Sequence, residues 1–320
     1  MKDVLGREIN YLRISITDRC NLRCKYCMPV PIEKVEMKEI LTFDEIVKVA
    51  SIAAELGIRY IKITGGEPLV RLGCDELIGM IKQVPGIEKV TMTTNGVLLA
   101  EHMPNLVAAG LDAVNISLDT RRRQRFREIT GRDEYERVVA GIEAAVAAGL
   151  RVKVNSVLAE GSNADEWRDL LLLAKEYPLD IRFIELMPIG YGKESQGVSN
   201  EELKRKIEQH YTLREDPTQH GFGPARYYNI DGFLGSVGFI SAMHGKFCRD
   251  CNRVRLTATG FLKPCLCFGE GVDLKTPLRE GAREQVKTLM ETVIKNKPKE
   301  HCFEHEEEIT ESHNMVGIGG

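Results

Sequence analysis

The chain has 320 residues, of which 43% are apolar and 28% are charged, and its formal net charge is −3. Such a chain can bury a substantial core, and its slightly acidic balance excludes a protein held on nucleic acid by bulk positive charge. No run of about 18 apolar residues occurs, so we expect no membrane-crossing helix. The first residues lack the apolar segment of a signal peptide. We therefore expect the nine cysteines to be metal ligands or free thiols in a reducing cytoplasm.

Six short runs rich in β-branched residues predict strands, and amphipathic segments of helical length separate them. The predicted strands are 12–17, 59–64, 89–94, 113–118, 152–157 and 180–184. Alternating strands and helices form right-handed crossovers, so this pattern predicts an α/β fold with parallel strands in a curved sheet or partial barrel. The segment 43–56 has apolar residues at helical spacing, and Thr42 before it is a suitable N-cap.

The pattern changes after about Gly190. A loop over 190–199 leads to a charged helix over 200–210, then to short strand-like runs and a second group of cysteines. We predict that residues 1–190 form the partial barrel. Residues 191–320 are expected to form a smaller α+β domain that caps its mouth.

Cys20, Cys24 and Cys27 form a C-x3-C-x2-C motif that supplies three thiolates from one loop. A [4Fe-4S] cube has four irons, so three cysteines leave one iron open to a small molecule. The alternative is a structural zinc site with a distant fourth ligand. We favour the cluster because the loop follows a predicted strand and Tyr26 can flank a bound ligand.

This loop resembles that of the radical S-adenosylmethionine (SAM) enzymes. The resemblance implies an incomplete (β/α)6 barrel and an open iron that chelates the amino and carboxylate groups of SAM. In that superfamily the reduced cluster gives one electron to SAM, which splits into methionine and a 5'-deoxyadenosyl radical. Gly66, in Thr-Gly-Gly-Glu-Pro, corresponds to the superfamily's motif for the SAM amino group, although alone such a turn is usually a tight connection.

A second triplet, Cys248, Cys251 and Cys265, has C-x2-C-x13-C spacing. A zinc ribbon would need a second pair, and Cys267 is the only spare cysteine nearby, so we favour a second [4Fe-4S] cluster with one open iron. Arg253 and Arg255 lie within this triplet. In an extended segment they share one side and suit a phosphorylated substrate, although a solvated pair is the alternative.

The two triplets, the Arg-x-Arg motif and the terminal Gly319-Gly320 together resemble the GTP 3',8-cyclases, the radical SAM family that opens molybdenum cofactor biosynthesis. The resemblance covers essentially the whole chain. It implies a lyase in which the adenosyl radical removes the ribose 3' hydrogen of GTP. The C3' radical then adds to guanine C8, giving 3',8-cyclo-7,8-dihydro-GTP.

The family resemblance also implies the cofactors and partners. The cofactors would be SAM and two [4Fe-4S] clusters. The partners would be the substrate GTP, a downstream cyclic pyranopterin monophosphate synthase and an electron donor such as flavodoxin or ferredoxin. We expect no membrane and no nucleic acid as partners, and a homodimer is left open.

Site residues follow from the same resemblance. The implied SAM contacts are Tyr26, Gly66, Ser117 and Met187. The implied GTP contacts are Arg13, Lys62, Thr93, Lys153, Arg182, Arg253, Val254 and Arg255. The implied catalytic set is Arg13, Arg253, Arg255, Gly319 and Gly320, the two glycines forming a tail that enters the active site. Lys62 departs from the family's common Arg and keeps its charge without the planar fork.

Three other features of the sequence have less weight as evidence of function. The arginines between 121 and 127 are expected to form a solvated helix face rather than a nucleic-acid patch. His301, Cys302 and His305 look like a metal tract, yet the glutamates that follow indicate a solvated segment. Cys74 and Cys302 are expected to be ordinary thiols.

Two other functions compete with the cyclase. A radical SAM protein that modifies peptides typically carries more C-terminal cysteines and a peptide-binding domain. A regulatory protein could use one cluster to sense iron or oxygen, and it would bind GTP without SAM-dependent turnover.

Overall fold

The computed structural model describes residues 1–28 and 35–319. The first six strands are β1 Tyr11–Ser15, β2 Tyr60–Thr64, β3 Lys89–Thr94, β4 Ala113–Ser117, β5 Arg151–Val157 and β6 Asp180–Ile184. The remaining strands are β7 Arg214–Asp216, β8 Arg226–Asn229, β9 Ser236–Ile240, β10 Arg253–Leu256, β11 Phe261–Lys263 and β12 Val272–Asp273. All six strands predicted from the sequence are confirmed, each to within two residues at either end.

Helices connect the strands. The α-helices are α1 Phe43–Glu55, α2 Cys74–Lys82, α3 Leu99–Ala108, α4 Arg123–Thr130, α5 Tyr135–Ala147, α6 Trp167–Leu171, α7 Leu173–Glu176, α8 Asn200–Glu208, α9 Lys275–Arg279 and α10 Arg283–Lys295. Short 3-10 helices are η1 Met37–Glu39, η2 Pro68–Val70, η3 Ala164–Glu166, η4 Gly190–Glu194, η5 Cys248–Asp250, η6 Glu306–Glu308 and η7 Met315–Ile318. None of the described helices is both long and apolar enough to cross a membrane.

The predicted N-cap of α1 is confirmed. The Thr42 hydroxyl accepts a hydrogen bond from the Glu45 amide, and the Glu45 carboxylate accepts one from the Thr42 amide at 2.8 Å. This reciprocal pair satisfies two amides that the helix leaves without intrahelical partners.

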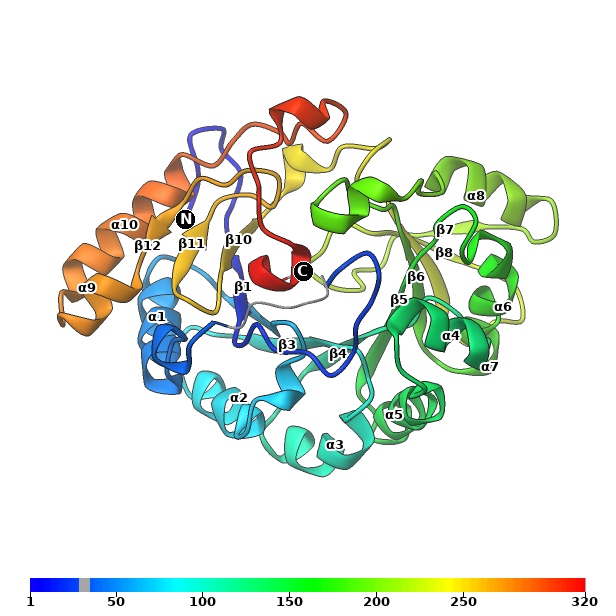
Figure 1. Cartoon of the computed structure of the whole chain (residues 1–320), viewed down its shortest axis with the longest axis horizontal. Helices are drawn as coiled ribbons and strands as arrows, with labels where there is room; N and C mark the ends of the chain where they lie inside the picture. Colours follow the sequence, from blue (N-terminus) through cyan, green and yellow to red (C-terminus); the bar gives the residue numbers. More distant parts are fainter. Residues whose placement is uncertain (29–34, 320) are drawn as a thin grey trace.

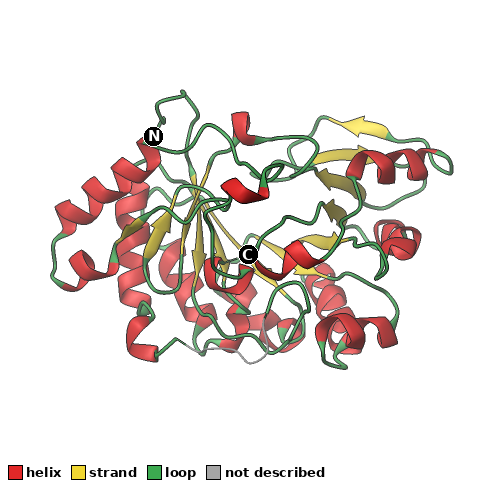
Figure 2. Ribbon diagram, turned by 45° about the horizontal axis from the view of Figure 1, so that its top comes forward, coloured by secondary structure: helices red, strands yellow, loops and turns green. Residues whose placement is uncertain are grey.

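The described strands form one open sheet in the order β12-β11-β10-β1-β2-β3-β4-β5-β6-β9-β8-β7. Strands β1 to β6 run parallel, as predicted, and β10 and β9 add parallel strands at either side. Antiparallel pairs finish both edges. Figures 1 and 2 show the long helices outside the curve of the strands and the C-terminal tail on its inner side.

The C-terminal part of the chain therefore extends the barrel wall at both ends. Strand β9 pairs with β6 and strand β10 pairs with β1, so one sheet crosses the predicted boundary near residue 190. The division into residues 1–190 and 191–320 stays a prediction.

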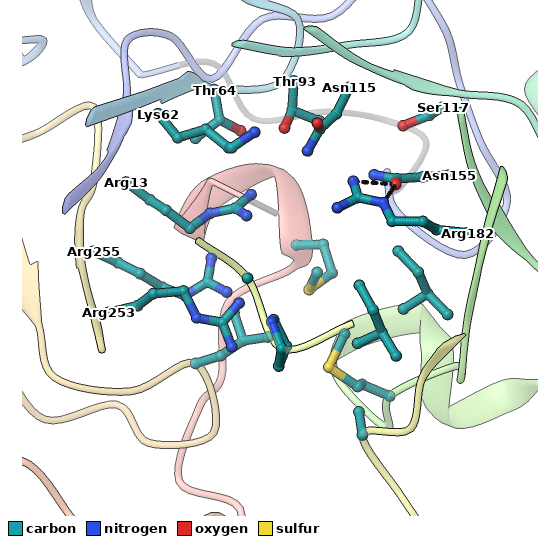
Figure 3. A pocket seen from close by; sticks show the side chains of 18 of the residues that line it. Arg13, Lys62, Thr64, Thr93, Asn115, Ser117, Asn155, Arg182, Arg253 and Arg255 are labelled. Carbon is teal, nitrogen blue, oxygen red and sulfur yellow. Dashed lines mark hydrogen bonds between the residues drawn. The ribbon is translucent and has the colours of Figure 1, made fainter. Parts of the chain in front are cut away.

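The two faces of the strands differ in polarity. Ile61 and Ile63 of β2 are fully buried and belong to the main apolar core. Lys62 between them points to the inner side of the sheet (Figure 3). Because side chains alternate along a strand, the outer face packs against helices while the inner face is free to build a polar site.

The arginine-rich segment before and within α4 forms ion pairs, as expected for a solvated face. Arg123 pairs with Asp133 at 2.9 Å, and Arg121 pairs with Glu176 at 2.8 Å. Arg125 contacts Asp165 and Glu166. These carboxylates neutralise the local positive charge that a nucleic-acid surface would need.

Candidate active site

Inward-facing side chains from successive strands meet in one cavity of about 570 Å³. The register places Arg255 beside Arg13 and Arg13 beside Lys62 across β10, β1 and β2. Across β4 to β6 it places Asn115 beside Lys153 and Asn155 beside Arg182. Figure 3 shows the labelled members of this ring directed toward the same space. The volume suits a small-molecule site.

Most site residues predicted from the sequence line this cavity. They are Arg13, Cys20, Cys24, Tyr26, Cys27, Lys62, Gly66, Thr93, Ser117, Lys153, Arg182, Met187, Cys248, Cys251, Arg253, Arg255 and Cys265. The fold thus brings together groups that lie more than 200 residues apart in the sequence, at the inner face of one sheet.

Burial acts strongly on the basic groups. The Lys62 side chain is buried, and burial together with Arg13 and Arg182 holds its pKa well below the usual range. Burial, followed by Arg182, lowers the pKa of Lys153 to about 7. Burial and the neighbouring Arg13 also lower the pKa of Arg255. Crowded cations favour a polyanion in the cavity because it would relieve their repulsion.

Two amides hold part of this cationic group. The Asn155 Oδ1 atom accepts hydrogen bonds from Arg182, including one of 2.9 Å from Nε. In the amide orientation that satisfies its neighbours, Asn115 Oδ1 accepts from Arg182 Nη2 at 2.9 Å and from Lys62 Nζ at 2.8 Å. The Thr93 hydroxyl, one strand away from Asn115, is buried and has no hydrogen-bond partner among the described residues. A ligand oxygen would satisfy it.

Other contacts position the rest of the ring. Lys153 donates to the His220 carbonyl, and the absence of a side chain at Gly221 leaves room for the Lys153 ammonium. The Arg253 guanidinium lies 5.1 Å from the centre of the Phe247 ring. Gly238 performs a similar role for Arg182, since a Cβ atom there would lie 3.1 Å from Arg182 Cγ.

The first cysteine loop is held against the Gly-Gly turn after β2. The Gly66 amide donates to the Thr17 carbonyl at 2.8 Å, and a Cβ atom at Gly66 would lie 2.4 Å from the Arg19 carbonyl oxygen. No side chain fits there without moving one of the two segments. Asn95 reaches the same loop and donates to Cys20 Sγ at 3.6 Å.

The sulfurs of this loop influence one another. Burial first, then Cys27, Asp119 and Cys20, raises the pKa of Cys24 well above its usual value, and burial and Cys20 raise that of Cys27 to about 12. A cationic iron would offset this cost by favouring the thiolates. Tyr26 also lines the cavity, and its hydroxyl donates to the buried Asp119 carboxylate, so its ring is held in place.

The second triplet lines the same cavity beside β10. The His301 amide lies 3.4 Å from Cys248 Sγ. Burial alone would raise the pKa of Cys251, but the positive charges of Arg253 and Lys297 outweigh it and lower the pKa to about 6. Cys251 is thus suited to bind metal as a thiolate.

The chemistry of the donor sets fits iron–sulfur clusters. Each triplet supplies three thiols that line the cavity, and three irons of a cube each take one thiolate, which leaves the fourth iron open. Both triplets are therefore assigned as cluster ligands in the proposal below.

Three predicted residues stand apart from the cavity lining. Val254 is fully buried in the apolar core on the opposite face of β10, so its side chain does not reach the site. Gly319 lies at the inner side, where its carbonyl accepts from Arg13 Nη2 at 3.3 Å and from Arg255 Nη1 at 3.2 Å. Gly320 lies outside the described residues.

The expectation of a solvated segment at 301–305 is wrong for its first three residues. His301 and Cys302 are only 4% and 8% exposed, and His301 stacks on Phe303. Cys302 Sγ lies 3.2 Å from Cys267 Sγ in a small apolar cluster that includes Ile318. His305 is exposed, as expected. Apolar packing at Phe303 overrides the acidic residues that follow. Cys74 is buried in the main core, as an ordinary thiol would be.

The sequence analysis did not single out Asn115, Asn155 or Asp119, and it placed His301 in a solvated segment. The first two carried a usable signal: Asn115 lies two residues before Ser117, and Asn155 lies two residues after Lys153. Side chains two apart on a strand share a face, so both amides could have been placed in the site. Asp119 and His301 lie in loops, where no periodicity applies.

The parallel partial barrel and its cysteine loop define a radical SAM protein. A family model described as "Radical SAM superfamily" matches residues 14–174, and one described as "Molybdenum Cofactor Synthesis C" matches residues 179–303. Two proteins named "GTP 3',8-cyclase", from Clostridium perfringens (strain 13 / Type A) and Heliobacterium modesticaldum, are 45% and 47% identical to this chain, with 100% of both chains covered. The chain belongs to the GTP 3',8-cyclase family, and this membership assigns it to molybdenum cofactor biosynthesis.

Solved structures support the fold. Streptococcus suis SuiB bound to S-adenosylmethionine matches with a TM-score of 0.64 and 17% identity, over 86% of this chain and 68% of SuiB. SuiB bound to its precursor peptide SuiA matches with a TM-score of 0.62 and 16% identity, over 92% of this chain and 66% of SuiB. At this level of identity the likeness concerns the fold alone, so it does not favour a peptide substrate here.

Proposed function

We propose that this chain converts GTP into 3',8-cyclo-7,8-dihydro-GTP with a radical derived from SAM. The observation that carries the proposal is one cavity lined by two cysteine triplets and a ring of buried and half-buried cations. A nucleoside triphosphate supplies the polyanion that this ring favours, and family membership makes GTP the expected nucleotide.

Cys20, Cys24 and Cys27 would hold the first [4Fe-4S] cluster and leave one iron for SAM. When bound, this cluster supplies one electron to SAM, which yields methionine and the 5'-deoxyadenosyl radical. Around it, Tyr26, Gly66, Ser117 and Met187 would contact SAM. Asp119 fixes the Tyr26 ring, and Gly66 keeps the cysteine loop close to the barrel wall.

Cys248, Cys251 and Cys265 would hold the second [4Fe-4S] cluster, whose open iron would take the guanine. Six cationic side chains would bind the triphosphate: Arg13, Lys62, Lys153, Arg182, Arg253 and Arg255. Thr93 would donate its hydroxyl, which has no hydrogen-bond partner among the described residues, to a substrate oxygen. Val254 would contribute backbone only, since its side chain lies in the core.

The substrate atoms balance in this scheme. The adenosyl radical takes the hydrogen from C3' and becomes 5'-deoxyadenosine, and the C3' radical forms a bond to guanine C8. One further electron and one proton complete a product that is an isomer of GTP. Holding both substrates in one cavity makes these steps effectively intramolecular. The tail of Gly319 and Gly320 would close the site, since the Gly319 carbonyl accepts from Arg13 and Arg255.

The partners follow from this chemistry. Two electrons per turnover call for a low-potential donor, for which flavodoxin or ferredoxin is our proposal. A cyclic pyranopterin monophosphate synthase would consume the product. The question of a homodimer stays open. The two parts of the chain, 1–190 and 191–320, would each supply one cluster to the shared cavity.

Anaerobic incubation of the reconstituted protein with dithionite, SAM and GTP tests the proposal. Mass analysis should show 5'-deoxyadenosine and a GTP isomer, and iron analysis should give about eight irons per chain. Zinc in anaerobically isolated protein, or 5'-deoxyadenosine without any GTP isomer, would contradict it.

A further inference from the structure

Two buried cations share one uncharged acceptor. Lys62 Nζ and Arg182 Nη2 both donate to Asn115 Oδ1, at 2.8 and 2.9 Å. Asn155 Oδ1 accepts from Nε of the same guanidinium and also from Nη2. Figure 3 shows these side chains bordering the space that Arg13, Arg253 and Arg255 also face.

This arrangement leaves the positive charge of the pair intact. Lys62, Arg182 and Asn115 are 5%, 6% and 7% exposed, so water can do little to stabilise the cations. Neither cation is ion-paired with a carboxylate among the residues that the structure describes. An aspartate would have almost the same shape as Asn115 and would bind both cations more strongly, but it would also cancel one positive charge.

The position of Asn115 in the sheet suits it to orient the side chains of Lys62 and Arg182. It lies within β4 between β3 and β5, and its register neighbours are Thr93 and Lys153. A side chain on a central strand is held more rigidly than one on a loop. Its amide oxygen therefore determines where the Lys62 ammonium and the Arg182 guanidinium lie before any ligand arrives.

We propose that Asn115 is a positioning residue for the triphosphate: it aligns Lys62 and Arg182 as a two-cation clamp while leaving their charge available, with Asn155 as the second support. The inference rests on the proposed function for the identity of the anion. It explains why this part of the ring uses amides where carboxylates would hold the cations more tightly.

The test compares Asn115→Asp and Asn115→Ala, with Asn105→Asp as a control for net charge on the exposed face of α3. Each reconstituted protein is examined for GTP affinity without SAM, for KM and kcat, and for the thermal midpoint of the ligand-free form. We expect Asn115→Asp to weaken GTP binding about tenfold to a hundredfold and yet to raise the thermal midpoint. We expect Asn115→Ala to weaken binding less and to lower the midpoint, and Asn105→Asp to change neither.

A purely structural role predicts the reverse order, because aspartate keeps the acceptor and alanine removes it. Wild-type or tighter GTP binding by Asn115→Asp would therefore overturn the inference. If that variant fails to take up iron, Asn155→Asp provides the same comparison through Arg182 alone.

Binding of inorganic tripolyphosphate separates this inference from the proposed function. If the wild-type protein binds tripolyphosphate but not GTP, the proposed function fails, and the order of the variants toward tripolyphosphate still tests the clamp. If GTP binds and is cyclised but both Asn115 variants retain wild-type affinity, the clamp fails and the proposed function stands.

Discussion

Arg255 donates from Nη1 to the carbonyl oxygen of Gly319, which connects the end of the chain to strand β10 across 3.2 Å. Arg13 donates to the same carbonyl from the neighbouring strand. The backbone of the tail is thus a direct partner of two cations that we assign to the triphosphate. Changes in the tail should alter the cationic ring without touching a side chain in it.

Gly319→Ala should lower GTP turnover at least about tenfold, since the free energy of one charge-assisted hydrogen bond corresponds to about that factor. Gly319 has φ of +69°, and a Cβ atom there would lie 2.9 Å from Ser15 Cβ, so alanine must shift the tail. Gly281→Ala is the matched control, because Gly281 has φ of +74° but nothing within 4 Å of its Cβ position. Turnover is measured as GTP isomer formed. A wild-type rate for Gly319→Ala would contradict a role of the tail in the active site.

Gly66→Ala should reduce the iron bound by the first cysteine loop. The added methyl group must displace either the Gly-Gly turn or the Arg19 backbone, and Cys20 follows Arg19 directly. Iron content and SAM cleavage should both fall while the second cluster is retained. Gly79→Ala on α2 serves as the control, since its nearest neighbour would be 4.0 Å away. Full iron content in Gly66→Ala would show that the close approach is dispensable.

Cys24→Ala should abolish release of 5'-deoxyadenosine, because an open-iron cluster loses one of its three protein ligands. Cys74→Ala removes a buried thiol that binds no cluster in our assignment and should retain SAM cleavage. Measuring 5'-deoxyadenosine after reconstitution distinguishes them. Continued release by Cys24→Ala would refute the ligand assignment.

GTP binding should weaken as the pH rises above 7. In the ligand-free protein Lys153 has a pKa of about 7, so above that pH the triphosphate must recruit a proton to meet a charged lysine. Lys153→Arg stays charged throughout this range. We expect the ratio of wild-type to variant Kd to rise between pH 7 and about 9, by up to about tenfold per pH unit. A ratio independent of pH would contradict the assignment of Lys153 to the triphosphate site.

The same pKa has a consequence for stability. The folded-state pKa of Lys153 lies below its unfolded value. At and below pH 7 the buried charge of Lys153 therefore lowers the free energy of unfolding of the ligand-free protein. This destabilisation disappears as the pH rises toward the unfolded value, and the thermal midpoint of ligand-free protein should rise accordingly. In Lys153→Met that rise should be smaller.

Local sequence signals predicted the strands well. Runs such as Lys89–Thr94 carry their own β-branched pattern. The N-cap at Thr42 depends on a contact with a residue only three positions away in the sequence. The pairing of β10 with β1 was not predicted, because it joins strands at opposite ends of the chain and no local pattern records it. For the same reason the burial of His301, which depends on Phe247 and Phe303, was missed.

The site shows the same division. The cysteine spacings and Arg253 with Arg255 could be interpreted from the sequence because their chemistry is local. Strand alternation could have placed Asn115 and Asn155 on the face of the site, but their importance lies in contacts with cations from other strands. Such partners are visible only once the register is known.

Because β1 gains its second neighbour only from residues 253–256, one side of it stays unpaired during most of synthesis on the ribosome. The nascent chain must therefore carry its first three cysteines beside an incomplete wall until about four fifths of the polypeptide has emerged. Iron that is delivered before this moment would meet the loop beside an open wall, whereas iron that is delivered later would meet it inside the finished cavity.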